Sequence, residues 1–146
     1  MMKKILVLDV ESTTKAKGHP FHAENTLCYV GLSDGSNTHL YDIEYSGDPY
    51  HLALDEIKDK IESSDLLVGF NIKFDLHWIR RYIDDIKFPP IWDCQLAEFL
   101  LSKQTTPYPS LDSAATKYNL GTKLDTVAIE YWDNGIDTTG VPRVIL

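Results

Sequence analysis

Residues 3–13 read KKILVLDVEST, a nearly continuous apolar run that leads directly into two carboxylates. The run predicts a strand over residues 4–10 that is buried on both faces of a sheet. Side chains two positions apart on a strand share a face, so Asp9 and Glu11 converge if the extended backbone lasts through Glu11. Two bare carboxylates repel each other, whereas a divalent cation neutralises both. The alternative is that Asp9 caps the strand end and Glu11 begins a solvated loop.

The rest of the pattern predicts an α/β fold built on a mixed sheet. Two segments joined by Asp34-Gly35-Ser36 predict an antiparallel hairpin, and a later strand returns through a helical crossover. The further expected strands are 26–33, 37–44, 65–70 and the first residues of IWDCQLAEFLL (91–101). The expected helices are 50–63, 72–83, the remainder of 91–101, 110–118 and about 125–132. The ends of strands 4–10 and 65–70 are then expected to lie side by side.

Length and composition predict one globular domain over residues 1–146. The chain has 146 residues, of which 43% are hydrophobic, enough for one core. Its formal net charge of −8 argues against a protein that grips duplex nucleic acid unaided, although a site for divalent cations needs clustered carboxylates. No apolar run approaches the roughly 20 residues of a membrane span, and no disulfide is expected between Cys28 and Cys94. We therefore expect a cytoplasmic protein, in the host cytoplasm if the source is viral, with no membrane partner.

A second polar cluster lies in GFNIKFDLHWI, residues 69–79. Asn71 is predicted to cap the helix over 72–83, because Asn is a preferred N-cap residue. Asp75 follows one turn later in an otherwise apolar helix face, where a carboxylate is costly unless it is paired or binds a metal. If the two strand ends meet, this cluster lies close to the carboxylates of the first strand.

Together, LDVEST and GFNIKFDLHWI resemble the first two motifs of the DEDD superfamily of 3′-to-5′ exonucleases. The likeness is greatest to the proofreading domains of family A DNA polymerases, especially those of bacteriophages. Asp9 and Glu11 match the first motif, and Asn71, Phe74 and Asp75 match the second. WDCQLAEFLL, YPSLDSAATKYNLGTKLD and EYWDNGID look like connecting segments of those domains, so the likeness spans nearly the whole chain. The resemblance implies a ribonuclease H-like mixed sheet, with an antiparallel hairpin and parallel strands, flanked by helices.

We expect the third motif of these exonucleases, Tyr-x-x-x-Asp or a His variant on a downstream helix, to be missing; the spacing from Tyr108 to Asp112 matches it, but these residues lie in the segment that resembles a connecting element. Tyr118 is followed four residues later by Thr122, and Tyr131 by Gly135. We therefore expect a chain that ends just before the helix with the fourth acidic ligand, and an activity that is impaired for this reason.

The resemblance implies two-metal hydrolysis of phosphodiester bonds at single-stranded DNA 3′ ends, as in proofreading during DNA replication. The catalytic residues, which would also hold Mg²⁺ or Mn²⁺ with two ions in the complete site, are Asp9, Glu11 and Asp75. The residues expected to contact the substrate are Ser12, Thr13 and Asn71. The expected partner is a polymerase domain, covalently attached or associated.

Other functions stay open at this point. DVEST also resembles the Asp-x-Asp-x-Thr motif of haloacid-dehalogenase-type phosphatases, but its second acid is Glu11, and no convincing lysine and acidic pair follows. His19 and His22 in HPFH have a spacing seen in zinc sites, although no further His or Cys cluster lies nearby in the sequence. A non-catalytic nucleic-acid-binding or structural module on the same fold, and an RNA-directed exonuclease, are the remaining alternatives.

Overall fold

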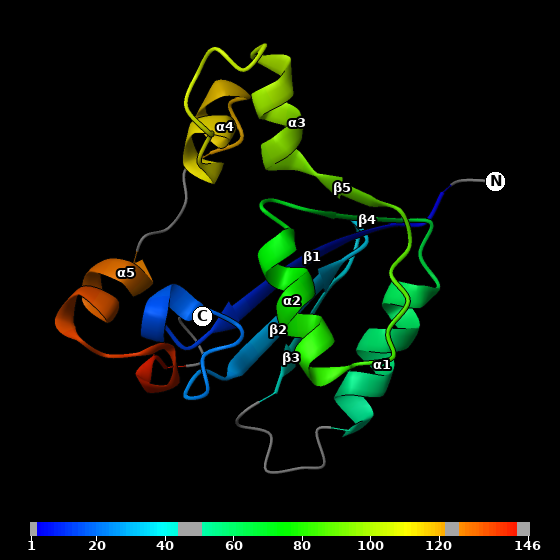
Figure 1. Ribbon diagram of the computed structural model, residues 1–146, viewed down its shortest axis with the longest axis vertical. Coiled ribbons are helices and arrows are strands. Elements are labelled where there is room, and N and C mark those ends of the chain that lie inside the picture. The colour runs from blue at the N-terminus through cyan, green and yellow to red at the C-terminus, as the bar shows by residue number, and fades with distance from the viewer. Residues whose placement is uncertain (1–2, 44–50, 122–125, 143–146) are drawn as a thin grey trace. The chain divides into compact units, whose positions relative to one another are not determined.

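The computed structural model describes residues 3–43, 51–121 and 126–142. The chain divides into two compact units, Met1–Asp93 and Cys94–Leu146, and each is described by itself (Figure 1). The first unit contains the sheet and the acidic motifs, so it carries the functional argument.

The sheet of the first unit has the strand order β3-β2-β1-β4-β5. Its strands are β1 (Ile5–Ser12), β2 (Leu27–Ser33), β3 (Thr38–Asp42), β4 (Leu66–Gly69) and β5 (Ile91–Asp93). Neighbours among β1, β2 and β3 are antiparallel, whereas β4 runs parallel to β1 and β5 parallel to β4. The predicted hairpin and mixed sheet are therefore confirmed, and the extended backbone of the central strand lasts through Glu11.

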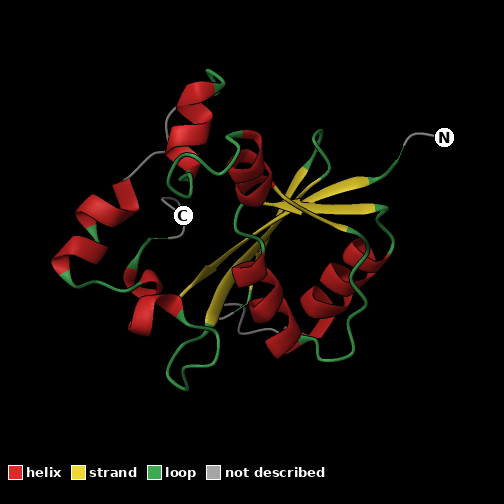
Figure 2. Ribbon diagram, turned by 45° about the horizontal axis from the view of Figure 1, so that its top comes forward, coloured by secondary structure: helices red, strands yellow, loops and turns green. Residues whose placement is uncertain are grey.

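One face of this sheet is covered by helices α1 (His51–Glu62) and α2 (Lys73–Tyr82) (Figure 2). Their apolar positions recur at helical spacing, which places them along the side of each helix that meets the strands. The buried cluster between sheet and helices includes Leu6, Leu8, Val30, Leu32, Leu67, Ile57, Ile61, Trp78 and Ile79. Burial of each large apolar side chain contributes roughly 1.5–3 kcal/mol. This cluster therefore fixes α2, which carries one of the acidic motifs, against the central strand.

Within the first unit, helices cover only one face of β1, so burial of the strand on both faces stays a prediction. The exposed fractions of Ile5 and Val7 are 46% and 42%, and Asp9 shares their face. Side chains along β1 alternate between buried and exposed because α1 and α2 pack against the same side of the sheet. The two carboxylates of the first motif follow this alternation onto the open face.

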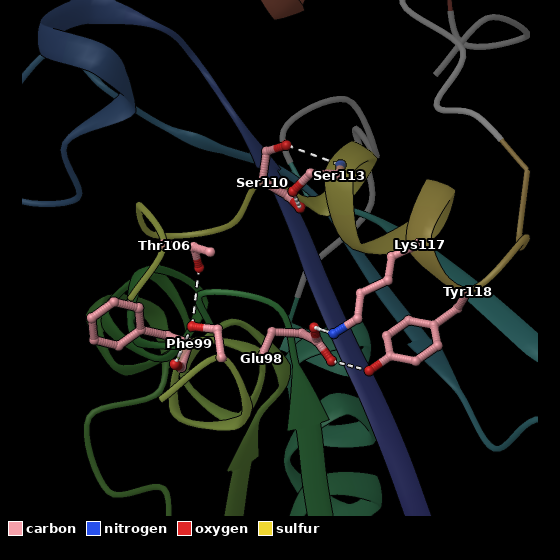
Figure 3. Close-up of polar contacts among 8 residues, drawn as sticks. Glu98, Phe99, Thr106, Ser110, Ser113, Lys117 and Tyr118 are labelled. Atoms are coloured by element: carbon pink, nitrogen blue, oxygen red, sulfur yellow. Dashed lines mark hydrogen bonds and ion pairs between the residues drawn. The ribbon is translucent and has the colours of Figure 1, made fainter. Parts of the chain in front are cut away.

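Polar contacts join α3 (Cys94–Leu101) and α4 (Leu111–Lys117) in the second unit (Figure 3). Lys117 Nζ lies 2.8 Å from Glu98 Oε2, and the Tyr118 hydroxyl donates a hydrogen bond to Glu98 Oε1. One glutamate of α3 is therefore bound by two successive residues at the end of α4. The side chain of Lys117 is 54% exposed and that of Glu98 is 13% exposed, so solvent screens this ion pair only in part.

The two helices predicted over 110–118 and about 125–132 are present. Ser110 caps α4, since its hydroxyl accepts a hydrogen bond of 3.1 Å from Ser113 N–H, and α5 (Thr126–Glu130) lies within the last predicted helix. Cys28 is buried and Cys94 is half-buried, and neither is part of a disulfide. No helix within the described residues has the length and apolarity needed to cross a membrane.

Candidate functional site

The centre of the candidate site is the carboxyl group of Asp75, in the first turn of α2. This side chain is 4% exposed, and its Oδ1 accepts a hydrogen bond of 2.9 Å from Val10 N–H. The pairing of β4 with β1 runs only from Ile5 to Val7, so Val10 lies beyond the end of that ladder. A buried N–H needs an acceptor, and β4 no longer provides a backbone carbonyl at this point. The carboxyl group of Asp75 accepts the hydrogen bond in its place. The same bond holds the start of α2 against the central strand.

Asp9 and Glu11 lie at the same end of β1 as this bond. Asp9 pairs with Gly31 and Glu11 with Tyr29 of β2, so the two carboxylates project from one face of the sheet. Asp9 is exposed and Glu11 is half-buried. Both are close enough for their negative charges to act on Asp75. The structure therefore brings the three predicted acidic residues into one electrostatically coupled group.

Burial raises the pKa of Asp75 to about 8, and the negative charge of Asp9 adds to this shift. The charge of Glu11 acts in the same direction but less strongly, while the hydrogen bond from Val10 opposes the shift. Without a cation, most Asp75 carboxyls are therefore protonated at neutral pH. A divalent cation could take the place of this proton, because it would offset the same negative charge.

The donor chemistry of the three side chains fits Mg²⁺ or Mn²⁺, since these ions prefer carboxylate oxygens. The Asp75 carboxyl group accepts from Val10 N–H through Oδ1, and its own backbone N–H also donates to it. In the part of the chain that the structure describes, no three His, Cys, Asp or Glu side chains are arranged to hold an ion.

Ser12 and Thr13, predicted to contact substrate, are buried and bond within the turn that follows β1. Ser12 Oγ donates to Thr13 O over 3.2 Å. Thr13 Oγ1 donates to Asn25 Oδ1 over 3.1 Å and accepts from Thr26 N–H over 2.9 Å. Asn25 is fully buried, and no sequence signal indicated its role, because Asn in a polar loop is ordinarily exposed. The two hydroxyls therefore shape the backbone beside the acidic group.

The loop after β1 is also tied to α2. Trp78 Nε1 donates to Gly18 O over 3.2 Å, and Arg81 Nη1 donates to Pro20 O over 2.6 Å. Gly18 has a φ of 71°, and a Cβ there would lie 3.0 Å from Ser12 Oγ. Glycine is required at this position both for its left-handed backbone and for the close approach. A loop glycine in the sequence indicates flexibility, so the sequence did not reveal these contacts.

Asn71 is not the N-cap of α2, which corrects the prediction. Ile72 occupies the cap position and makes no side-chain capping bond. Asn71 instead has a φ of 56°, in the left-handed region that Asn tolerates, and its N–H donates to Asp93 Oδ1 over 3.0 Å. Its side chain is exposed at the start of α2. Asp93, at the end of β5, thus positions the turn that leads into the helix, and the only sequence signal for it is an acid at a strand end.

The histidines of HPFH, His19 and His22, accept hydrogen bonds from backbone N–H groups of their own loop. His19 Nδ1 accepts from Phe21 N–H over 3.2 Å, and His22 Nδ1 accepts from Glu24 N–H over 3.3 Å. Each Nδ1 is therefore occupied by a backbone donor two residues ahead. This pattern is typical of turn residues and does not favour a zinc site.

A protein family described as 3′-5′ exonuclease matches residues 3–138 of the chain. No curated protein matches the sequence. The family match covers both acidic motifs and most of the second unit.

Several solved structures share the fold. The EXO domain of Aedes aegypti Nibbler has a TM-score of 0.65 and 13% identity, with 89% of this chain and 65% of that chain covered. A structure described as the apo form of the nuclease has a TM-score of 0.64 and 14% identity, with 86% and 56% covered. The family B DNA polymerase of the hyperthermophilic archaeon Pyrobaculum calidifontis has a TM-score of 0.56 and 16% identity, with 84% and 19% covered. The chain thus spans less than two thirds of each structure, and the likeness confirms the ribonuclease H-like mixed sheet.

Proposed function

Because the chain belongs to the 3′-5′ exonuclease family, we propose that it hydrolyses the terminal phosphodiester bond at the 3′ ends of single-stranded DNA. The observation that carries this proposal is the buried carboxyl group of Asp75, held by Val10 N–H beside Asp9 and Glu11. Fold stability alone gives no reason to gather three acids at one strand end, because their mutual repulsion opposes folding.

Each acid has a distinct task in this proposal. Asp9 is exposed on the open face of the sheet and offers its carboxylate to a cation and to the substrate side of the site. Glu11, half-buried on the same face, would help to hold the cation that activates the attacking water. Asp75 would release its proton to solvent if a cation bound, while Oδ1 would keep the bond to Val10 N–H. The site therefore changes its charge while the bond that positions α2 stays in place.

Asp9, Glu11 and Asp75 are the residues that would hold Mg²⁺ or Mn²⁺. When bound, divalent cations supply a lowered pKa for the attacking water and positive charge beside the phosphate. Asn71 is the predicted substrate residue whose side chain is exposed, and it stands at the start of α2 where a nucleotide could reach it. Ser12 and Thr13 would act through the backbone of the turn that their hydroxyls hold.

We expect the domain to act in proofreading beside a polymerase domain, attached or associated, as the resemblance to family A polymerases implies.

The proposal is tested by release of mononucleotides from a 5′-labelled single-stranded oligonucleotide in Mn²⁺. We expect a ladder that shortens one nucleotide at a time, and a rate that Asp9→Asn lowers by more than the roughly 10- to 100-fold typical of residues that only support metal ligands. Asp59→Asn is the matched control, because Asp59 is an exposed carboxylate on α1. An oligonucleotide of RNA tests the RNA-directed alternative in the same assay.

Two outcomes would contradict the proposal. Internal cleavage products would indicate an endonuclease. Equal rates for Asp9→Asn and Asp59→Asn would remove Asp9 from the site.

A non-catalytic module is the second candidate, and the observation that favours it is the lack of an arranged three-ligand group among the described residues. In such a module Asp75 would serve only as the acceptor for Val10 N–H. Titration calorimetry with Mn²⁺ separates the two functions. An exonuclease site predicts cation binding that Asp9→Ala abolishes, whereas equal heats for wild type and variant favour the module.

A further inference from the structure

A groove of about 550 Å³ runs along α2 on the side turned away from Asp75. Lys73, His77 and Arg80 line it, and their spacing of four and three residues puts them on one helix face. Asp75 lies two residues after Lys73, about 200° around the helix, so it projects from the other side. The groove is therefore separate from the acidic site, although it begins within one turn of it.

The charge of the groove is opposite to that of the chain. Its lining contains the three basic residues and no acidic residue, in a chain whose formal net charge is −8. The other lining side chains are apolar or aromatic: Phe21, Leu76, Phe88 and Ile91. A polyanion that also has flat apolar groups would therefore be complementary to the basic and to the aromatic side chains of the groove.

Two aromatic rings lie beside the basic residues of the groove. The ring of Phe21 packs edge-on against His77, with ring centroids 5.4 Å apart, and Arg80 lies over Phe88, 5.3 Å from the ring centroid. Phe21 is 68% exposed, which is unusual for a large apolar side chain in an ordered loop.

The backbone on both sides of Phe21 is fixed to α2. Arg81 Nη1 donates to Pro20 O over 2.6 Å and to His22 O over 3.3 Å. Phe21 N–H donates to His19 Nδ1 over 3.2 Å. The exposed ring is therefore held in place above the groove, at little further entropic cost when a ligand binds.

We propose that this groove binds a segment of single-stranded nucleic acid, with phosphates on Lys73 and Arg80 and a base stacked on Phe21. The inference rests on the proposed nuclease function, which supplies the class of ligand. A cationic groove with aromatic platforms is the arrangement by which proteins hold unpaired strands without reading their sequence. An acidic protein segment would use the cations but would not need a fixed, exposed ring. The groove gives this acidic chain a local anchor for a substrate that its net charge repels.

Fluorescence anisotropy tests the proposal with a 5′-fluorescein-labelled twelve-nucleotide oligothymidylate, in EDTA so that the strand stays intact. Phe21→Ala is expected to weaken binding by about fivefold or more, the usual loss for one stacked base, and Phe21→Trp to restore it. Arg80→Glu is expected to weaken binding and to lower the slope of log affinity against log salt by about 0.7 for each phosphate that the variant no longer neutralises. Arg80→Lys is expected to keep most of the affinity.

Lys3→Glu is the matched control, since it makes the same charge change at an exposed residue two positions before β1. Thermal unfolding followed by circular dichroism verifies that each variant is folded. If Arg80→Glu and Lys3→Glu weaken binding equally, or if Phe21→Ala and Arg80→Glu bind as wild type does, the groove is not the anchor and the proposal is wrong. Absence of binding by the wild type overturns it as well. None of these outcomes alters the nucleotide-release assay with Asp9→Asn, so failure of the groove and failure of the proposed function are distinguishable.

Discussion

Replacing Asp75 with Asn tests the electrostatics of the acidic site without removing its central hydrogen bond. The Asn side chain has nearly the same shape, and its amide oxygen can accept from Val10 N–H as Asp75 Oδ1 does over 2.9 Å. The substitution therefore removes only the ionisable group. Asp75→Ala removes the acceptor too and leaves a buried N–H without a partner, which adds a cost of about 1–3 kcal/mol.

The size of the effect follows from the pKa of Asp75, which burial and the charge of Asp9 raise from 3.8 to about 8. Between these pH values the folded protein binds more protons at this group than the unfolded chain does. The free energy of unfolding of the metal-free protein therefore falls as pH rises through this window. Each pH unit corresponds to about 1.4 kcal/mol, so four units amount to a loss on the order of 5 kcal/mol. Below pH 3.8 both states are protonated, and the contribution vanishes.

Urea unfolding in EDTA between pH 4 and pH 8 measures this difference. We expect wild type and Asp75→Asn to be similarly stable at pH 4, and the variant to be more stable by a few kcal/mol at pH 8. Added Mg²⁺ should narrow the gap, because a ligand that binds only the folded wild type stabilises it. Asp85→Asn is the control: its carboxylate is exposed and lies 2.5 Å from Lys58 Nζ, which lowers its pKa. If the free energies of unfolding of wild type and Asp75→Asn changed in parallel with pH, the reasoning would be wrong, because ionisation of Asp75 would then not destabilise the folded protein.

Substitutions at three further positions test the loop, the turn and the strand that hold the acidic site in place. Gly18→Ala should lower the free energy of unfolding by about 1 kcal/mol or more, and the unfolding temperature with it. The reasons are that φ at this position is 71° and that the new Cβ would lie 3.0 Å from Ser12 Oγ. An unchanged unfolding temperature would count against this loop geometry. Asp93→Ala should cost about 0.5–1.5 kcal/mol in urea unfolding, because the lost bond to Asn71 N–H is exposed and water can replace the acceptor, whereas Asp93→Asn should cost less; equal losses would assign the effect to packing. Leu67→Ala, at a fully buried position of β4, should cost about 2–5 kcal/mol, and a loss below that range would place β4 outside the core.

Local patterns were sufficient to predict the strands and their order along the chain. The turn Asp34-Gly35-Ser36 between two β-rich segments predicted β2 and β3, and the structure pairs these strands antiparallel. The spacing of Asp9 and Glu11 predicted a shared face, because a strand repeats every two residues. Such features depend on neighbours in sequence, which is why they could be predicted without any knowledge of tertiary contacts.

Which face of the sheet is covered could not be predicted in the same way. The apolar run through Ile5 and Val7 is compatible with burial on both faces, whereas within the first unit helices cover only the other face of β1. The difference arises because α1 and α2 follow crossovers that place them on the same side of the sheet. The sequence of a strand shows how apolar the strand is. Whether each of its faces is buried also depends on helices that are remote in the sequence.

The prediction for the turn before α2 was wrong for a related reason. Asn is a common N-cap, so the local pattern predicted Asn71 as the cap. In the structure a residue twenty-two positions later, Asp93, accepts its N–H and holds Asn71 at a φ of 56°. Helix boundaries depend on where the orphan N–H groups find acceptors, and here the acceptor comes from the neighbouring strand.

For Asp75, one part of the environment could be predicted from the local sequence and another part depends on residues that are remote in the sequence. The sequence indicated that a carboxyl group in an apolar helix face needs a partner, and a paired charge or a metal was the expected one. The partner in the structure is a backbone donor, Val10 N–H, which is available because β4 stops pairing with β1 at Val7. A mismatch in strand length thus creates the place where a helix can deliver an acid to the end of the central strand. No side-chain pattern encodes that mismatch, so the presence of the site could be predicted from sequence, but the hydrogen bond that builds it could not.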